Sequence, residues 1–345
     1  MDERRTGILI GLASALLFGL GAPVSKLLLP HAGPLPLAGL LYLGGGAAFF
    51  LVRRSRTEAP LTRADAPIVA GAVLAGAALA PPLMLWGLTR VSGLAGSLLL
   101  NLEAPFTMAL AVTVFGEHLS RREGMAAALI VAGGAIVGAH GSDGGLAGSM
   151  LGVLAIALAC LCWAIDNNFN ARLSMKDPVQ LLRIKMLCAG ALNLAAAAIF
   201  GQRVQGMRVA VGALLLGSLS YGLSFLLYTR AQRVLGAARQ GALFAVAPFA
   251  GAALAIPLLG DRASLSDLAG AVVMAAGVLV LARARHGHLH THAPLTHDHL
   301  HTHDAHHRHT HEGTVEQEPH SHLHTHGALT HEHPHVSDAH HKHRH

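Results

Sequence analysis

Charged side chains are scarce in this 345-residue sequence, and most are excluded from its long apolar stretches. Only 13% of the residues are charged, whereas 52% are hydrophobic. A large soluble helical protein rich in Ala and Leu would need a polar face on each surface helix, and these stretches have none. The scarcity of charge therefore argues against a soluble globular protein and predicts a lipid bilayer as the partner of this chain.

Cysteine is also rare, and no signature of catalysis or of nucleic-acid binding is present. Cys160, Cys162 and Cys188 lie inside apolar stretches and form no C-x-x-C pair, so they are interpreted as small packing residues. The formal net charge of +6 does not gather into a basic patch, so we expect no nucleic-acid partner. No Gly-rich phosphate loop or nucleophile–base arrangement occurs, and we expect no enzyme and no required cofactor.

Ten apolar runs are each long enough to span a membrane as a helix, which takes about 20 residues. They predict an all-α integral membrane protein with ten transmembrane helices. The runs cover residues 6–29, 35–52, 66–88, 92–115, 123–140, 147–171, 178–200, 209–229, 236–258 and 265–282.

A motif that occurs twice divides these runs into two sets of five. Ala104-Pro105-Phe106 precedes Gly116-Glu117, and the same pattern returns as Ala247-Pro248-Phe249 before Gly260-Asp261. An odd number of spans per copy places the second copy in the membrane upside down, as in many secondary transporters. We therefore predict one five-helix repeat in residues 1–143, a second in 144–285, and a separate tail in 286–345.

The distribution of Lys and Arg predicts the orientation. If both termini are cytoplasmic, the cytoplasmic segments carry fourteen of these residues and the outer segments five. The outer five are Lys26, Arg90, Arg203, Arg208 and Arg262. The positive-inside rule then predicts a multi-pass protein of a bacterial-type inner membrane with both termini in the cytoplasm.

The repeated segments resemble the drug/metabolite transporter superfamily, specifically its EamA-type members. The resemblance is carried by G-x-x-x-G-L-x-S-A-L-L-F-G from Gly7 to Gly19, by the Pro105 to Glu117 segment, and by the second copies of both. The strings SLLLNLEAPF (97–106) and ACLCWAIDNN (159–168), together with a histidine-rich tail, are similar to a distinct branch. The resemblance covers residues 6–282 and implies a ten-helix transporter fold. Asp261 departs from the pattern, which usually has Glu there.

Pro105 and Pro248 each remove one helix hydrogen bond, so we expect matched kinks in the fourth and ninth spans, close to a central cavity. Glu117 and Asp261 end these spans, and hydrogen bonding at a helix end is the interpretation favoured over transport.

A few polar residues lie inside the spans, where an ionisable group is costly and normally faces a cavity or a partner. In the sixth span their 3–4 spacing predicts one shared face. The predicted cavity residues are Asn101, Glu103, Trp163, Asp166, Asn167, Asn170, Lys185 and Tyr221. Two interpretations stay open: a structural Asp166–Lys185 ion pair with the asparagines joining helices, or a site where Glu103 and Asp166 bind a proton or the transported cation.

The last 60 residues contain 23 of the 26 histidines and little apolar content, so we expect a tail that is disordered on its own. The tail repeats with a period of 34, since H-G-H-L-H-T-H from His286 returns as H-S-H-L-H-T-H from His320. Imidazole ligands predict loose binding of nickel, cobalt, zinc or copper, the alternative being a solvated pH-responsive spacer. The predicted ligands are His286, His288, His290, His292, His297, His299, His301, His306, His307, His309, His320, His322, His324, His326, His331, His333, His335, His340, His341 and His343.

The sequence thus favours an exporter of a divalent transition metal or its complex. The alternatives are a small-metabolite exporter, for amino acids or drug-like molecules, that the tail regulates, and a membrane-tethered metal buffer. The repeated kinks argue against a mere tether, which needs one helix. The transported partner is therefore either a metal ion or a small molecule, and a homodimer is left open as an assembly.

Overall fold

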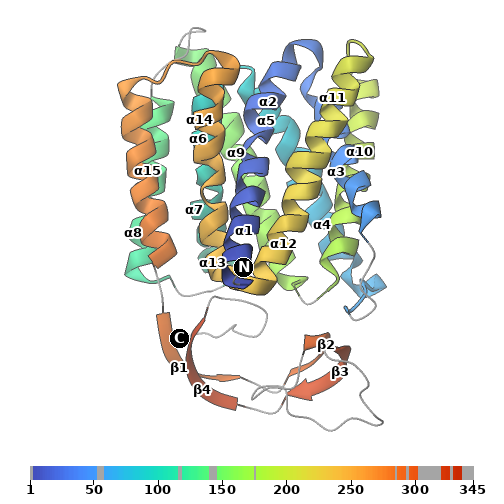
Figure 1. Cartoon of the computed structure of the whole chain (residues 1–345), viewed down its shortest axis with the longest axis vertical. Coiled ribbons are helices and arrows are strands. Elements are labelled where there is room, and N and C mark those ends of the chain that lie inside the picture. Colours follow the sequence, from blue (N-terminus) through green and yellow to red (C-terminus); the bar gives the residue numbers. More distant parts are fainter. Residues whose placement is uncertain are drawn as a thin grey trace.

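A computed structural model describes residues 3–52, 58–115, 119–139, 146–174 and 176–283, together with four strands in the tail. Residues 3–283 form a bundle of long helices, and the first and last helices begin and end at the same end of it (Figure 1). This end is called the terminal end below. The chain must cross the bundle an even number of times for its first helix to begin, and its last helix to end, at this same end.

The first repeat contains five crossings, several of them built from more than one helical segment. They are α1 (Glu3–Gly19) with α2 (Gly21–Leu28) and η1 (Leu29–His31), α3 (Pro34–Ala48) with η2 (Phe49–Leu51), η3 (Arg63–Asp65) with α4 (Ala66–Ala72), η4 (Val73–Leu79) and α5 (Ala80–Leu88), α6 (Gly93–Leu99) with η5 (Leu100–Leu102) and α7 (Glu103–Phe115), and α8 (Arg121–Gly138).

The second repeat follows the same plan. Its crossings are α9 (Leu146–Arg172), α10 (Pro178–Ile199), α11 (Met207–Gly217) with η6 (Ser218–Leu223) and α12 (Ser224–Leu235), α13 (Ala237–Phe244) with α14 (Ala247–Leu259), and α15 (Leu265–Arg283).

Nine helical segments in the described part of the chain are long and apolar enough to cross a membrane. The fifth predicted span, α8, is not among them because it begins with Arg121, Arg122 and Glu123, which lower its apolar character. We count α8 as the tenth crossing because it packs along α15, which is one of the nine.

The α8–α15 contact depends on two facing glycines. A Cβ atom added at Gly133 would lie 2.7 Å from the Gly270 carbonyl oxygen, and one added at Gly270 would lie 2.8 Å from that of Gly133. Close approach of this kind lets backbones pack in lipid, where hydrophobicity does not drive helix association. The two helices hold equivalent positions in the two repeats, as do α3 and α10, which also pack together.

Matched irregular turns interrupt the third and eighth crossings. The segments η4 and η6 are both π-helical, and their first residues, Val73 and Ser218, are 145 positions apart, close to the spacing of the sequence repeat. A π-helical segment widens the helix and often marks a functional site. Hydrophobic periodicity did not predict either segment.

The two motif prolines lie where the fourth and ninth crossings are broken. Pro105 is in the first turn of α7, which directly follows the 3₁₀ segment η5. Pro248 is in the first turn of α14, which two residues separate from the end of α13. Proline has no N–H to donate to the preceding turn, so a helix that contains it in its interior loses a hydrogen bond there. The structure places this break in both repeats.

Two short backbone bridges tie the repeats together at opposite ends of the bundle. Ala32 pairs with Val204 and Ala59 with Lys176, in antiparallel and parallel fashion respectively. Residues 32 and 176 are 144 positions apart, and residues 59 and 204 are 145 apart, so the inverted repeat relates one bridge to the other. The Ala59–Lys176 bridge, at the terminal end, is called the terminal tie, and the Ala32–Val204 bridge the far tie.

The tail contains four strands, although the sequence predicted no regular structure there. They are β1 (His286–His292), β2 (Leu295–His301), β3 (His320–His326) and β4 (Leu329–His335). Strand β1 pairs with β4 and β2 with β3, each time in antiparallel register. The physical reason is the strict H-x-H alternation, which has the period of a strand.

Candidate functional site: a polar centre around the sixth crossing

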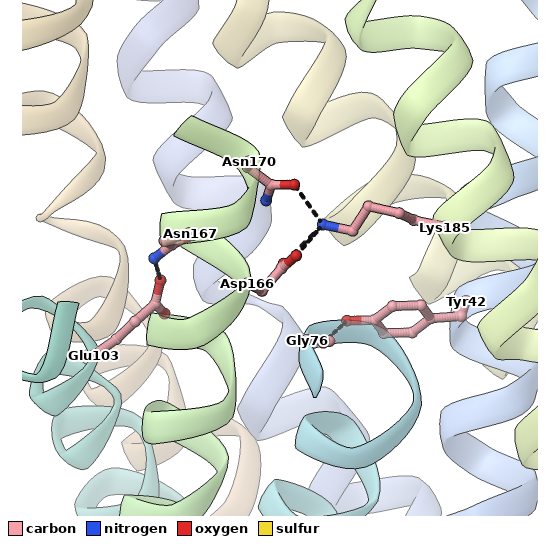
Figure 2. Close-up of polar contacts among 7 residues, drawn as sticks. All are labelled: Tyr42, Gly76, Glu103, Asp166, Asn167, Asn170 and Lys185. Atoms are coloured by element: carbon pink, nitrogen blue, oxygen red, sulfur yellow. Dashed lines mark hydrogen bonds and ion pairs between the residues drawn. The ribbon is translucent and has the colours of Figure 1, made fainter. Parts of the chain in front are cut away.

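A buried ion pair joins the sixth and seventh crossings. The Lys185 ammonium on α10 donates to both carboxylate oxygens of Asp166 on α9, at 2.6 and 2.7 Å, and to Asn170 Oδ1 at 3.2 Å (Figure 2). Asp166 and Lys185 are 7% and 5% exposed. Each side chain therefore neutralises a charge that would be costly inside a membrane protein. The Asp166–Lys185 contact of the first interpretation is thus present in the structure.

Glu103 lies on the other side of α9, at the start of α7. The Asn167 amide donates to its Oε1 at 2.7 Å, and the Thr107 hydroxyl donates back to the Glu103 carbonyl oxygen at 2.9 Å. The Asn168 amide donates to the Thr107 carbonyl at 3.3 Å, so two consecutive asparagines hold α7 against α9. Glu103 is half-buried, and the partner of its carboxylate here is a neutral amide.

The sequence predicted one polar face on the sixth crossing, whereas in the structure the polar side chains of α9 lie on two different faces. Asp166 and Asn170, one turn apart, reach Lys185, whereas Asn167 reaches Glu103 on the opposite side of the helix (Figure 2). A step of one residue turns an α-helix by about 100°, so Asp166 and Asn167 diverge even though both fit a 3–4 pattern with Trp163. The two carboxylates therefore lie on opposite sides of α9: Asp166 faces α10, whereas Glu103 comes from α7.

The π-helical segment η4 packs against the ion pair. A Cβ atom added at Gly76 would lie 2.3 Å from Asp166 Cγ, so only glycine leaves room for this carboxylate. The Tyr42 hydroxyl donates to the Gly76 carbonyl oxygen at 3.4 Å, and the Asn193 amide donates to that of Ala77 at the same distance. Carbonyl groups of η4 thus find partners outside their own helix.

Between the ion pair and η6 lies a group of aromatic rings. Tyr221, inside η6 and 5% exposed, lies 5.3 Å from the Tyr42 ring and 5.9 Å from the Phe18 ring, centroid to centroid. Trp163 is half-buried and packs against the same apolar cluster. Tyr42 of α3 therefore contacts both π-helical segments, through its hydrogen bond to Gly76 in η4 and its ring contact with Tyr221 in η6.

Sequence reasoning missed several of these residues. Tyr42, Gly76 and Thr107 show no unusual pattern, because each acts through a neighbour from another crossing. The scarcity of tyrosine, three in the whole chain, was the one available signal for Tyr42.

Asn101, predicted in the cavity, lies elsewhere. Its amide donates to the Leu98 carbonyl oxygen at 2.9 Å and contacts the Met274 sulfur at 3.9 Å, so it belongs to the contact between the fourth and tenth crossings. The Leu98 carbonyl precedes the 3₁₀ segment η5, and the Asn101 side chain folds back to donate to it rather than reaching toward α9.

Asp261 makes the helix-end hydrogen bond that was favoured for it. Its carboxylate accepts from the Leu94 backbone N–H at 2.8 Å, in the first turn of α6, where negative charge also suits the helix dipole. Gly260 ends α14 with a φ of 72°, a left-handed conformation that suits glycine. Gly116 and Glu117, their counterparts in the first repeat, lie outside the described residues.

At the terminal end, charged groups surround the terminal tie. Arg233 forms an ion pair with Glu58, and Lys176 lies 3.5 Å from Asp65. Burial raises the pKa of the Glu58 carboxyl above its ordinary value, and Arg233 opposes that rise. Glu58 and Arg233 also line a cavity of about 100 Å³. The far tie carries neutral contacts instead, such as Gln202 Oε1 accepting from the Leu35 N–H at 3.1 Å.

Over the part of the chain that the structure describes, no three His, Cys, Asp or Glu side chains gather around one point that could hold a metal ion. Of the predicted tail ligands, fourteen fall within β1 to β4. The other six, His306, His307, His309, His340, His341 and His343, lie outside the described residues.

Comparison with known proteins places the bundle in a family of transporters. The profile of the EamA-like transporter family matches twice, over residues 5–139 and 150–283. An uncharacterized transporter of Methanothermobacter thermautotrophicus is 26% identical over 297 residues, covering 81% of this chain and 87% of its own. A probable amino-acid metabolite efflux pump of Salmonella typhimurium is 29% identical over 294 residues, covering 81% and 95%.

A solved structure, described only as the crystal structure of a protein, is similar with a TM-score of 0.56 and 18% identity. It covers 80% of this chain and 96% of its own. At this identity the likeness shows the fold alone.

Proposed function

The chain belongs to the EamA-like transporter family, and we propose that it exports a small metabolite carrying both an ammonium and a carboxylate group. The observation that carries this proposal is the buried Asp166–Lys185 pair. It supports the second of the two cargoes that the sequence suggested, a metabolite of the amino-acid type, over a bare divalent ion.

The pair offers one charge of each sign within a mostly apolar surrounding. A substrate carboxylate can take the place of Asp166 beside Lys185, while the substrate ammonium binds Asp166, so that no charge is left without a partner. Asn170 already accepts from Lys185 and adds a polar contact at the same point. Trp163, Tyr42 and Tyr221 provide apolar surface for a side chain. A divalent cation, by contrast, would have to compete with Lys185 for the only carboxylate on that face of α9.

Glu103 is the group that we assign to proton coupling. Its carboxylate is held by the Asn167 amide, so it can gain or lose a proton without breaking an ion pair. Its partner Asn167 directly follows Asp166 on α9, and Glu103 itself lies on the opposite side of this helix from the Asp166–Lys185 pair (Figure 2). This separation lets one helix respond to both the proton and the substrate.

Divalent metal as the cargo is the second candidate, and the tail alone favours it. Twenty-three histidines in 60 residues form a dense supply of neutral nitrogen ligands at cytoplasmic pH. In the proposal made here the tail binds nickel, cobalt, zinc or copper and regulates the exporter, with both termini on the cytoplasmic side of the inner membrane.

Transport by the purified protein in vesicles tests these candidates together. Vesicles loaded with radiolabelled amino acids are compared with vesicles loaded with nickel, cobalt, zinc or copper, using the full chain and a variant that ends at residue 285. The proposal predicts counterflow of at least one amino acid by both proteins and metal sensitivity only in the full chain. Transport of a metal ion but no amino acid would favour the second candidate.

A further inference from the structure

The two copies in the tail, which start 34 residues apart at His286 and His320, pair with each other and not within themselves. Strands β1 and β2 belong to the first copy, and β3 and β4 to the second. Strand β1 pairs with β4, and β2 with β3, so each ladder joins one strand from each copy.

In both ladders the register sets histidine opposite histidine. Because opposed positions recur every second residue, the three pairs of a ladder share one face of it. The pairs are His286–His335, His288–His333 and His290–His331 in one ladder, and His297–His324, His299–His322 and His301–His320 in the other.

We propose that these opposed histidines are the metal sites of the tail, and that a divalent transition ion bound there joins the two copies. The proposal rests on the metal-binding role given to the tail above. Directly opposed residues of an antiparallel pair have Cβ atoms about 4.5–5.5 Å apart, which suits two imidazoles sharing one ion. Each opposed pair brings two histidines, one from each copy, to the same register position.

Metal binding and strand pairing then stabilise each other. An isolated two-stranded ladder is marginal in water, and these strands contain few apolar residues to support it. Binding free energy at a site that exists only in the paired state is also folding free energy. Metal should therefore slow amide hydrogen exchange in all four strands, from both copies at once.

The register also provides matched controls. His292 is opposite Leu329, and His326 is opposite Leu295, so these two histidines have no histidine across from them. Replacing them removes as many imidazoles as replacing one opposed pair, without removing a pair.

The experiment titrates zinc and nickel into the purified full-length protein at neutral pH and counts bound ions by calorimetry. Three variants accompany it: truncation after Pro319, His288→Ala with His333→Ala, and the control His292→Ala with His326→Ala. The truncated chain keeps twelve of the 23 tail histidines, because eleven lie beyond residue 319.

If each metal site joins the two copies, we expect truncation after Pro319 to remove nearly all tight metal binding. The variant with His288→Ala and His333→Ala should lose about one bound ion, and the control with His292→Ala and His326→Ala should lose none. Copies that bind independently would leave about half of the ions on the truncated chain, and this result would overturn the proposal while preserving a metal-binding tail. Absence of binding by the full chain would overturn the tail's metal role itself. Hydrogen exchange slowed in β1 but unchanged in β4 would also contradict pairing across the copies.

Discussion

At the scale of single residues, the polar centre consists of two carboxylates in different situations on either side of one helix. Asp166 is compensated by a lysine and enclosed by Gly76, whereas Glu103 is held by an amide. Their residue types could be predicted from the sequence, because charge inside a span stands out. Their separation could not, since it depends on which neighbouring helix faces each side of α9.

Removing the Asp166 charge tests the ion pair. Asp166→Asn leaves the Lys185 ammonium buried without its anion, and we expect a loss of about 3 kcal/mol in stability. Adding Lys185→Met removes the unpaired charge and should restore the melting temperature in detergent, although not transport. Unchanged melting of the single variant would contradict a buried, mutually dependent pair.

Removing the Glu103 charge tests proton coupling. Glu103→Gln keeps an oxygen for the Asn167 amide, so we expect a folded protein that still exchanges substrate by counterflow. Transport driven by a pH gradient should fall to background, because glutamine cannot carry the proton. Thr113→Val, further along α7, serves as the control and should retain gradient-driven transport, because its exposed hydroxyl donates to the Ala109 carbonyl of its own helix. Normal gradient-driven transport by Glu103→Gln would remove this residue from the coupling step.

At the scale of elements, the crossings, the matched proline positions and the two-repeat plan follow from the sequence, because apolar runs and a repeated motif report them directly. The π-helical segments do not, since Val73–Leu79 and Ser218–Leu223 read as ordinary apolar helix and owe their geometry to packing against other crossings. The pairing of the tail strands could not be predicted either, because composition carries no information on which strand lies beside which.

The two backbone ties predict two engineered disulfides. With the three native cysteines replaced, Ala32→Cys with Val204→Cys and Ala59→Cys with Lys176→Cys should each cross-link under mild oxidation, since bridge partners have the Cα spacing that a disulfide requires. Altered mobility on gel electrophoresis after cleavage at a site inserted between the partners measures the bond. A control pair that joins residues from opposite ends, Ala32→Cys with Lys176→Cys, should not cross-link.

At the scale of the whole molecule, the start of α1 and the end of α15 both lie at the terminal end of the bundle. The count of Lys and Arg residues predicts that this end is cytoplasmic. Arg203→Cys and Arg230→Cys, at exposed positions on opposite ends, report the orientation in a cysteine-free background. A membrane-impermeant maleimide should label position 203 in intact cells and position 230 only after lysis. The reverse pattern would place the tail outside and contradict the proposal that it senses metal in the cytoplasm.

The central claim is that the Asp166–Lys185 pair binds the substrate, and exchanging the two charges tests it most directly. Asp166→Lys with Lys185→Asp keeps one charge of each sign on the same two helices, and its melting temperature shows whether the pair still forms. Amino-acid counterflow in vesicles is then measured for the folded double variant. The account predicts that transport by the folded double variant falls at least tenfold, because the substrate's charges now face the wrong helices. Transport at the wild-type rate would show that the pair serves only to hold α9 against α10.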